Sequence, residues 1–338
     1  MRRLTELCLR YMQKILSLWR FSRPHTIIGS SISVFCLFAF SALTIKALDE
    51  QTAANSVISY VFTESDIYLF AATLIAALAC NVFITGLNQI TDIEIDRINK
   101  PHLPLASGEI SSAEAKKWVV LALVTALSIS FYLSNFFGVL IALICFLGWS
   151  YSAPPIRFKR YHIWAASAIA LVRGPLVNVG IALHFLTQVG HNTYFSNVGV
   201  GNFLSIPLEF FEVGVWMVPL TLFISAFSLG IAWFKDLPDT AGDAEHEVGT
   251  LAVKKGRALA LRLGVSVVGL AYVFLIFWGI IILGGIPFIA YHLIALGIFA
   301  YWAYRTNLDA TLSLKRFYKL YWVLFFLEYF SFFLIWIP

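Results

Sequence analysis

Two acidic clusters hold the side chains in this sequence that are best suited to chemistry. Carboxylates or amides recur every three or four residues in both: Asn88, Asp92 and Asp96 in the first, and Asp236, Asp239 and Asp243 in the second. Residues at that spacing lie on one face of a helix, so we expect each cluster to form one acidic stripe. Hard carboxylate oxygens suit Mg²⁺. The sequence therefore predicts that these six side chains bind magnesium and that four of them are catalytic: Asp92, Asp96, Asp239 and Asp243.

The spacing of the two clusters indicates a duplication. Asp92 and Asp239 are 147 residues apart (239 − 92), and Asp96 and Asp243 are separated by the same number (243 − 96). Acidic residues near helix ends are often caps or solvated loop edges, which is the alternative for either cluster taken alone. The matching separation favours equivalent sites in two pseudo-repeats, at about 23–160 and about 161–303.

The elements that must position these clusters are transmembrane helices. Of the 338 residues, 59% are hydrophobic and 13% are charged, and the mean hydropathy is +0.80. Soluble globular chains are only about 45–50% apolar. Nine apolar stretches have a length suited to a hydrocarbon core of about 30 Å: roughly 27–47, 67–90, 118–134, 136–151, 162–186, 213–234, 258–281, 286–303 and 317–337. We therefore predict an all-α integral membrane protein with nine transmembrane helices.

The basic residues alternate from loop to loop. They concentrate in the N-terminal segment, residues 1–22, and in the loops after the second, fourth, sixth and eighth spans. By the positive-inside rule, these loops and both acidic clusters are cytoplasmic, and the C-terminus lies across the membrane. A bacterial inner membrane or an internal, thylakoid-type membrane fits this pattern. The net charge of +5 then reflects the inside bias and an anionic substrate, and gives no reason to expect a nucleic acid.

A basic turn follows the fourth span on the same side as the carboxylates. It begins at Tyr151, is stiffened by two prolines, and ends with Arg157, Lys159 and Arg160. Alone, these bases are what the positive-inside rule requires. Beside a magnesium site, they are suited to neutralising a diphosphate. The predicted diphosphate-binding residues are Lys100, Arg157, Lys159, Arg160 and Lys235.

One arginine falls inside a predicted span. Arg173 lies about a dozen residues into the fifth span, about 18 Å along the helix. A charge at that depth usually faces a cavity or pairs with a carboxylate. Two roles remain open: a ligand-binding residue, or an internal ion pair with Glu328 of the last span.

These motifs together resemble the UbiA superfamily of intramembrane aromatic prenyltransferases. The two aspartate clusters resemble its two aspartate-rich motifs, and residues 151–160 resemble its basic loop. The run from Gly86 to Glu109 is similar to the homogentisate phytyltransferase branch found in cyanobacteria and plastids, as are the segments 23–26 and 234–239. The resemblance covers about residues 20–337. The segment 240–250 departs from the pattern, which leaves the length of the prenyl donor open.

The resemblance implies a specific fold and reaction. The fold is a bundle of two four-helix halves plus a ninth helix around a central cavity, formed by residues 23–338. The reaction is Mg²⁺-dependent transfer of a polyprenyl group, phytyl, from its diphosphate to homogentisate with loss of CO₂, in tocopherol biosynthesis. Other acceptors (4-hydroxybenzoate, a chlorophyllide) and other donors (geranylgeranyl or solanesyl diphosphate) remain alternatives. The implied acceptor-binding residues are Arg23, Tyr151, Arg173 and Asn178.

A different class of protein is disfavoured. A secondary transporter places its ionisable residues near the membrane midplane, whereas the two clusters lie at loop ends. The partners we expect are a polyprenyl diphosphate, a small aromatic acceptor and membrane lipid.

Overall fold

The computed structural model describes residues 2–52, 63–189, 209–283 and 285–336, and every regular element in those ranges is helical. Nine of the described segments are long and apolar enough to cross a membrane, at the nine predicted places. Six are single α-helices: α2 (Pro24–Thr52), α3 (Glu64–Thr91), α5 (Ser112–Leu133), α6 (Asn135–Ser152), α10 (Glu209–Asp236) and α14 (Ile286–Arg305). The predicted all-helical membrane fold is confirmed.

The other three spans are composite. The fifth combines α7 (His162–Leu171), the π-helix η2 (Val172–Leu176) and α8 (Val177–Gln188). The seventh joins α13 (Arg257–Trp278) to the π-helix η4 (Gly279–Leu283), and the ninth joins α15 (Thr311–Ser331) to the 3₁₀ turn η5 (Phe332–Trp336). π-Helical turns inside a longer helix are often found at functional sites, and η2 contains Arg173 and Pro175.

Local signals set the helix ends. Thr63 caps α3 with a capping box, in which its hydroxyl accepts from the Asp66 N–H and the Asp66 carboxylate accepts from the Thr63 N–H. Ser134 alone separates α5 from α6, and its hydroxyl accepts a 3.1 Å hydrogen bond from the N–H of Phe137. This cap turns the chain back on itself, so α5 and α6 form a tight hairpin.

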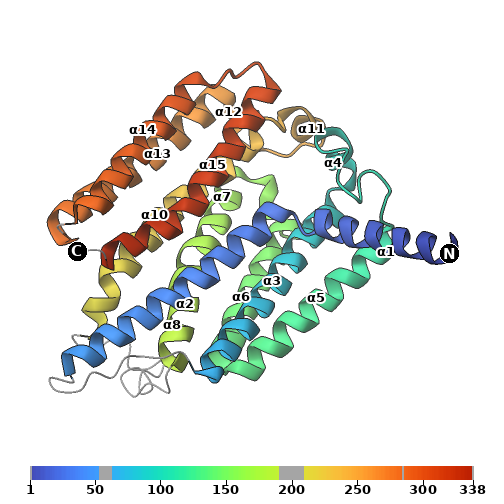
Figure 1. Ribbon diagram of the computed structural model, residues 1–338. Helices are drawn as coiled ribbons and strands as arrows, with labels where there is room; N and C mark the ends of the chain where they lie inside the picture. Colours follow the sequence, from blue (N-terminus) through green and yellow to red (C-terminus); the bar gives the residue numbers. More distant parts are fainter. Residues whose placement is uncertain (1, 53–62, 190–208, 284, 337–338) are drawn as a thin grey trace.

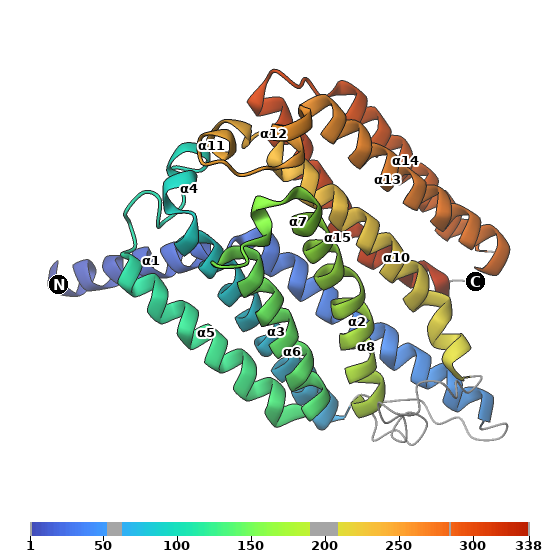
Figure 2. The ribbon, with the colours of Figure 1, turned by 180° about the vertical axis from the view of Figure 1, so that it is seen from behind.

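The spans run side by side at a common slant (Figure 1). The first four, α2, α3, α5 and α6, pack together, and the next four, α7–α8, α10, α13 and α14, form the second group. The ninth, α15, closes the bundle against α2, α10 and α14. In both views the short helices α4 (Ile93–Asn99), α11 (Thr240–Glu245) and α12 (Leu251–Lys255) gather at one end of the bundle (Figure 2).

The N-terminal segment, which the sequence placed outside the spans without assigning it a structure, forms a helix. α1 (Arg2–Phe21) projects from the end of the bundle that carries α4 and α11 (Figure 1). Its Ser17 and Arg20 both donate hydrogen bonds to the carboxylate of Glu109, in the loop between α4 and α5. The helix is therefore fixed to the loop that follows the first acidic cluster.

Candidate active site

A cavity of about 690 Å³, called the outer cavity here, opens at the end of the bundle where α4 and α11 meet. All six predicted magnesium ligands line it: Asn88, Asp92, Asp96, Asp236, Asp239 and Asp243. Five predicted substrate-binding residues line it too: Arg23, Lys100, Tyr151, Lys159 and Lys235. Residues far apart in the sequence therefore meet around one space.

The acidic clusters do not lie on continuous helices, which corrects the predicted stripes. The α3 helix ends at Thr91, and α4 begins at Ile93, with Asp92 at the junction in a non-helical conformation (φ −120°, ψ 19°). The second cluster breaks in the same way, because α10 ends at Asp236 and Asp239 precedes α11. Each cluster is thus divided between the end of a span and a short helix folded over it. That fold-over, repeated in both halves, turns the carboxylates toward the shared cavity.

One residue that the sequence did not single out joins the two halves. The side chain of Asn99, on α4, donates to Asp243 Oδ1 at 3.3 Å and accepts from the Gly242 N–H at 3.1 Å. A side chain at Gly242 would collide with this amide. The position of Asn99 just after the first cluster, next to Lys100, was the only signal in the sequence. Its partners on α11 could not be predicted without the fold.

Basic side chains already neutralise the first cluster. Lys159 forms an ion pair with Asp92 and donates a 2.9 Å hydrogen bond to Thr91 Oγ1. Arg157 reaches Asp92 Oδ1 at 3.4 Å. Arg23 donates to Asn88 Oδ1 at 3.2 Å, which places it with the acidic cluster as well as with the acceptor site for which it was predicted.

The second cluster is neutralised from both halves. Lys100, from the first half, forms an ion pair with Asp239. Lys235 lies 3.6 Å from Asp236 and donates a 2.7 Å hydrogen bond to the hydroxyl of Tyr151. Two of the predicted diphosphate-binding residues, Arg157 and Arg160, line neither cavity. Arg157 still contacts Asp92, whereas Arg160 is exposed and is not brought to the site.

Burial makes these charges costly. Desolvation raises the pKa of Asp243 to about 7, with repulsion from Asp236 and Asp239 as the next causes. The pKa of Asp96 is raised by burial, against the opposing effect of Arg23 and Lys100. Burial also lowers the pKa of Lys159 to about 8, although Asp92 opposes the shift. The site therefore gains from an additional cation.

The residues present fit a magnesium ion that shares its ligands with a substrate. Asp96 is 4% exposed, and its buried Oδ2 has no hydrogen-bond partner among the described residues. No group of three or more acidic, histidine or cysteine side chains in the described ranges converges closely enough to enclose a metal. Mg²⁺ usually binds through one or two carboxylates, waters and substrate phosphates. Two facing clusters on one cavity match that preference better than a closed protein cage.

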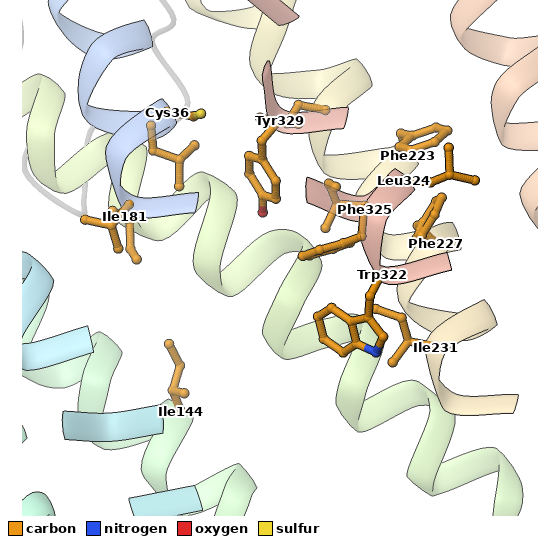
Figure 3. Packing of buried hydrophobic residues seen from close by; sticks show 14 of the residues in the cluster. Cys36, Ile144, Ile181, Phe223, Phe227, Ile231, Trp322, Leu324, Phe325 and Tyr329 are labelled. Atoms are coloured by element: carbon orange, nitrogen blue, oxygen red, sulfur yellow. The ribbon is translucent and has the colours of Figure 1, made fainter. Parts of the chain in front are cut away.

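A second cavity, of about 260 Å³, continues from the first toward the middle of the bundle and is called the inner cavity here. The two share Arg23, His25, Asn88, Tyr151, Lys235, Tyr318 and Trp322. Apolar side chains form most of the remaining wall of the inner cavity. In Figure 3, Trp322, Phe325 and Tyr329 project from α15 toward Ile144 and Ile181 on the opposite wall.

Arg173 faces this inner cavity. Its guanidinium carbon lies 5.0 Å from the ring centre of Trp322 and 5.7 Å from that of Phe325. Cation–π contacts of this kind partly replace water around a buried cation. Its hydrogen-bonding edge is not paired with a carboxylate in the described part of the chain. A carboxylate of a ligand bound in the cavity could form the ion pair that this guanidinium lacks.

The alternative ion pair with Glu328 is not formed. Glu328 accepts a 2.6 Å hydrogen bond from the hydroxyl of Tyr272, and its other oxygen lies 3.4 Å from Nε2 of His292. These contacts hold α13, α14 and α15 together. The acidic partner that the sequence offered to Arg173 therefore has a separate structural role.

Asn178 is also placed differently from the prediction. It is fully buried and lines neither cavity. Its amide nitrogen donates to the carbonyls of Arg173 and Gly174, both at 3.0 Å. Because its polar atoms are engaged within the protein, Asn178 supports the π-helix that carries Arg173 and does not reach an acceptor.

Comparisons with known proteins agree with this geometry. Residues 51–328 match the UbiA prenyltransferase family. The chain belongs to that family. As a UbiA prenyltransferase it is an enzyme and a multi-pass integral membrane protein, as predicted.

Individual UbiA relatives cover almost the whole chain. A homogentisate phytyltransferase from Synechocystis is 35% identical over 331 residues, which are 97% of this chain and 98% of the relative. A chloroplastic homogentisate solanesyltransferase from Arabidopsis thaliana is 32% identical over 93% of this chain and 75% of its own length. The structure of a UbiA homologue from Archaeoglobus fulgidus bound to DMAPP and Mg²⁺ has a TM-score of 0.57 at 17% identity, and covers 95% of this chain and 100% of the other. That likeness shows that the two proteins share a fold.

Proposed function

We propose that this enzyme transfers a phytyl group from phytyl diphosphate to the aromatic ring of homogentisate, with Mg²⁺ as cofactor and loss of CO₂, as a step of tocopherol biosynthesis. The observation that carries the proposal is the 35% identity to a homogentisate phytyltransferase along 97% of the chain. The two adjoining cavities support it, because one is lined by opposite charges, and the other is largely apolar with Arg173 on its wall and Arg23 and Lys235 where it joins the first. The identity to a homogentisate solanesyltransferase supports the acceptor more strongly than the donor.

The outer cavity is suited to the diphosphate. Lys100, Lys159 and Lys235 line its wall, and each lies next to at least one carboxylate of the two clusters. Magnesium, bound between the two clusters, would stabilise the negative charge that develops on the leaving diphosphate. The lysines add fixed positive charge around the same oxygens, and their burial strengthens each interaction. Asp92 positions Lys159, Asp239 positions Lys100, and Asp236 lies beside Lys235.

The inner cavity is suited to the acceptor and the reacting end of the prenyl chain. Its apolar wall excludes water, which protects a cation-like allylic carbon from hydrolysis. Arg173 offers a planar guanidinium to the acceptor carboxylate, and the aromatic rings around it fix its orientation. Tyr151 and Lys235 lie where the two cavities join, so they mark where the two substrates meet.

The topology completes the proposal. The N-terminus, the helices α4 and α11 and the outer cavity share one end of the bundle, and the basic loops assign that end to the cytoplasm. The membrane is a bacterial inner membrane or a thylakoid-type membrane.

The test is a substrate matrix with the enzyme in lipid. Homogentisate, 4-hydroxybenzoate and a chlorophyllide are each offered with phytyl, geranylgeranyl and solanesyl diphosphate, with and without Mg²⁺. The proposal predicts the highest kcat/KM for homogentisate with phytyl diphosphate and no product without the metal. Preference for another acceptor would reject the proposed reaction, and preference for another donor would reject phytyl alone.

A further inference from the structure

The proposed reaction needs a proton acceptor that the preceding assignment lacks. A dihydroxyphenyl ring attacks through carbon more readily when a phenolic hydroxyl loses its proton. The titratable side chains on the inner cavity wall are Arg23, His25, Cys80, Tyr151, Arg173, Lys235, Tyr318 and Tyr329. Arginine and lysine hold their protons at neutral pH, and tyrosine is a phenol like the substrate. Cys80 is buried against Cys145, 3.5 Å away.

His25 is the remaining base among the described lining residues. A neutral imidazole carries one nitrogen lone pair that is free to accept a proton. No described residue forms a hydrogen bond with either of its ring nitrogens. The ring lines both the inner and the outer cavity, so its nitrogens are accessible to a bound ligand.

The position of His25 relative to Arg173 fits one small acceptor. Both side chains pack on the same indole, since the ring centre of His25 lies 4.9 Å from that of Trp322 in an edge-to-face arrangement and Arg173 lies over it at 5.0 Å. Arg173 and His25 therefore both border the part of the inner cavity beside Trp322, where an acceptor bound by Arg173 would lie. The charged groups that face the imidazole, Arg23, Arg173 and Lys100, are all cations. They keep the ring neutral until the anionic groups of the substrates offset their charge.

The carboxylates of the outer cavity are less suited to this step. Asp92 and Asp239 are each bound by a lysine, and neither lines the inner cavity. They are also the residues assigned to magnesium. The five carboxylates assigned to magnesium line the outer cavity only, whereas His25 also lines the inner one.

We propose that His25 accepts the phenolic proton of the aromatic substrate as its ring carbon bonds to C1 of the prenyl group; this rests on the proposed function. The C1–O bond breaks with its electron pair passing to the diphosphate. When the ring regains aromaticity, the imidazolium returns its proton to the phenolic oxygen and the substituted ring carbon loses its hydrogen as a proton. With homogentisate, the side-chain carbon takes up one proton when CO₂ leaves, so the number of protons balances.

The experiment compares His25→Gln and His25→Ala with His246→Gln, a matched change at a histidine that lines neither cavity. We measure kcat, the acceptor KM, and the slow release of diphosphate from the donor without acceptor. We expect kcat to fall at least about 100-fold in both His25 variants. The acceptor KM and the diphosphate release should change less than about threefold, and added imidazole should restore part of kcat in His25→Ala only.

Two outcomes would overturn the proposal. Near-normal kcat in His25→Gln shows that no proton passes through this ring. Equal loss of acceptor transfer and of acceptor-free diphosphate release shows that His25 acts on the donor or on folding. The proposed function is judged separately by the wild-type enzyme. If that enzyme prefers 4-hydroxybenzoate, which also has a phenolic hydroxyl, the same comparison is made with that acceptor.

Discussion

Tyr329 donates a 2.8 Å hydrogen bond from its hydroxyl to Oδ1 of Asn178, and so connects α15 to the π-helical turn that carries Arg173. Asn178 in turn binds the carbonyls of Arg173 and Gly174. Pro175, inside this turn, has no N–H to donate. The side chain of Asn178 adds hydrogen bonds to the carbonyls of Arg173 and Gly174 at the point where the helix widens.

Tyr329→Phe should consequently disturb acceptor binding by loosening the turn that carries Arg173. It leaves Oδ1 of Asn178 buried without a donor, a cost of about 1–3 kcal/mol. We expect a higher acceptor KM with a smaller change in the donor KM, and a lower melting temperature in detergent. Tyr301→Phe, at an exposed tyrosine, is the matched control. Equal effects on both substrates would contradict a role in aiming Arg173.

Arg173 and Glu328 should behave independently, because they do not form an ion pair. Arg173→Lys should raise the acceptor KM, since an ammonium cannot reproduce the planar fork of a guanidinium. Glu328→Gln should lower the melting temperature by weakening the contacts with Tyr272 and His292. The double variant should show the sum of the two effects. Rescue of stability in the double variant would instead mean that the pair exists.

Loss of a metal-binding carboxylate should abolish turnover in a folded protein. We expect Asp92→Ala and Asp239→Ala to reduce kcat by about 10²–10⁴-fold, because each removes charge stabilisation at the leaving group. Glu94→Ala and Glu245→Ala are matched controls on α4 and α11, the short helices that follow the two aspartates. Glu94 is 67% exposed, and neither side chain lines a cavity. Loss of activity in the controls as well would point to the helices and not to the metal.

The basic turn offers a comparison within one short segment. Lys159→Ala should raise the donor KM and leave the acceptor KM nearly unchanged, because Lys159 lines the outer cavity. Arg160→Ala should have no effect on either, since Arg160 is exposed beyond the cavity wall. If both variants weaken donor binding equally, the claim that only bases lining the outer cavity bind the diphosphate is wrong.

Magnesium activation should depend on pH through Asp243. Its raised pKa of about 7 means that below pH 7 a proton occupies the carboxylate and competes with the metal, whereas above pH 7 the carboxylate is free. The apparent Mg²⁺ activation constant should therefore fall by up to about tenfold between pH 6 and pH 8. Titrating Mg²⁺ at saturating donor across this range measures the effect. A constant that does not change with pH would exclude Asp243 as a ligand.

Features that follow from a short-range pattern could be predicted from the sequence. The nine spans were predictable because each is a long apolar run, and the carboxylates because their spacing recurs after 147 residues (239 − 92). Which side chains of distant helices contact one another could not be predicted in the same way. The pairing of Glu328 with Tyr272 and His292, and of Asn99 with Gly242, depends on how distant helices pack. The breaks at Asp92 and after Asp236 were also missed, since helical spacing alone does not show where a helix ends.

Lys159 with Asp92 and Lys100 with Asp239 form two ion pairs in which each charge already has an opposite partner. In the proposed complex, a metal ion would contribute positive charge beside these carboxylates, and a diphosphate would contribute negative charge beside these lysines. Loading the site is then an exchange of partners and not an addition of charge. If the metal binds alone, it separates a lysine from its carboxylate, and the lysine is left without an anion. If the donor binds alone, its diphosphate separates a carboxylate from its lysine, and the carboxylate is left without a cation. The two ligands release each other's counter-charges, so each should bind more tightly in the presence of the other.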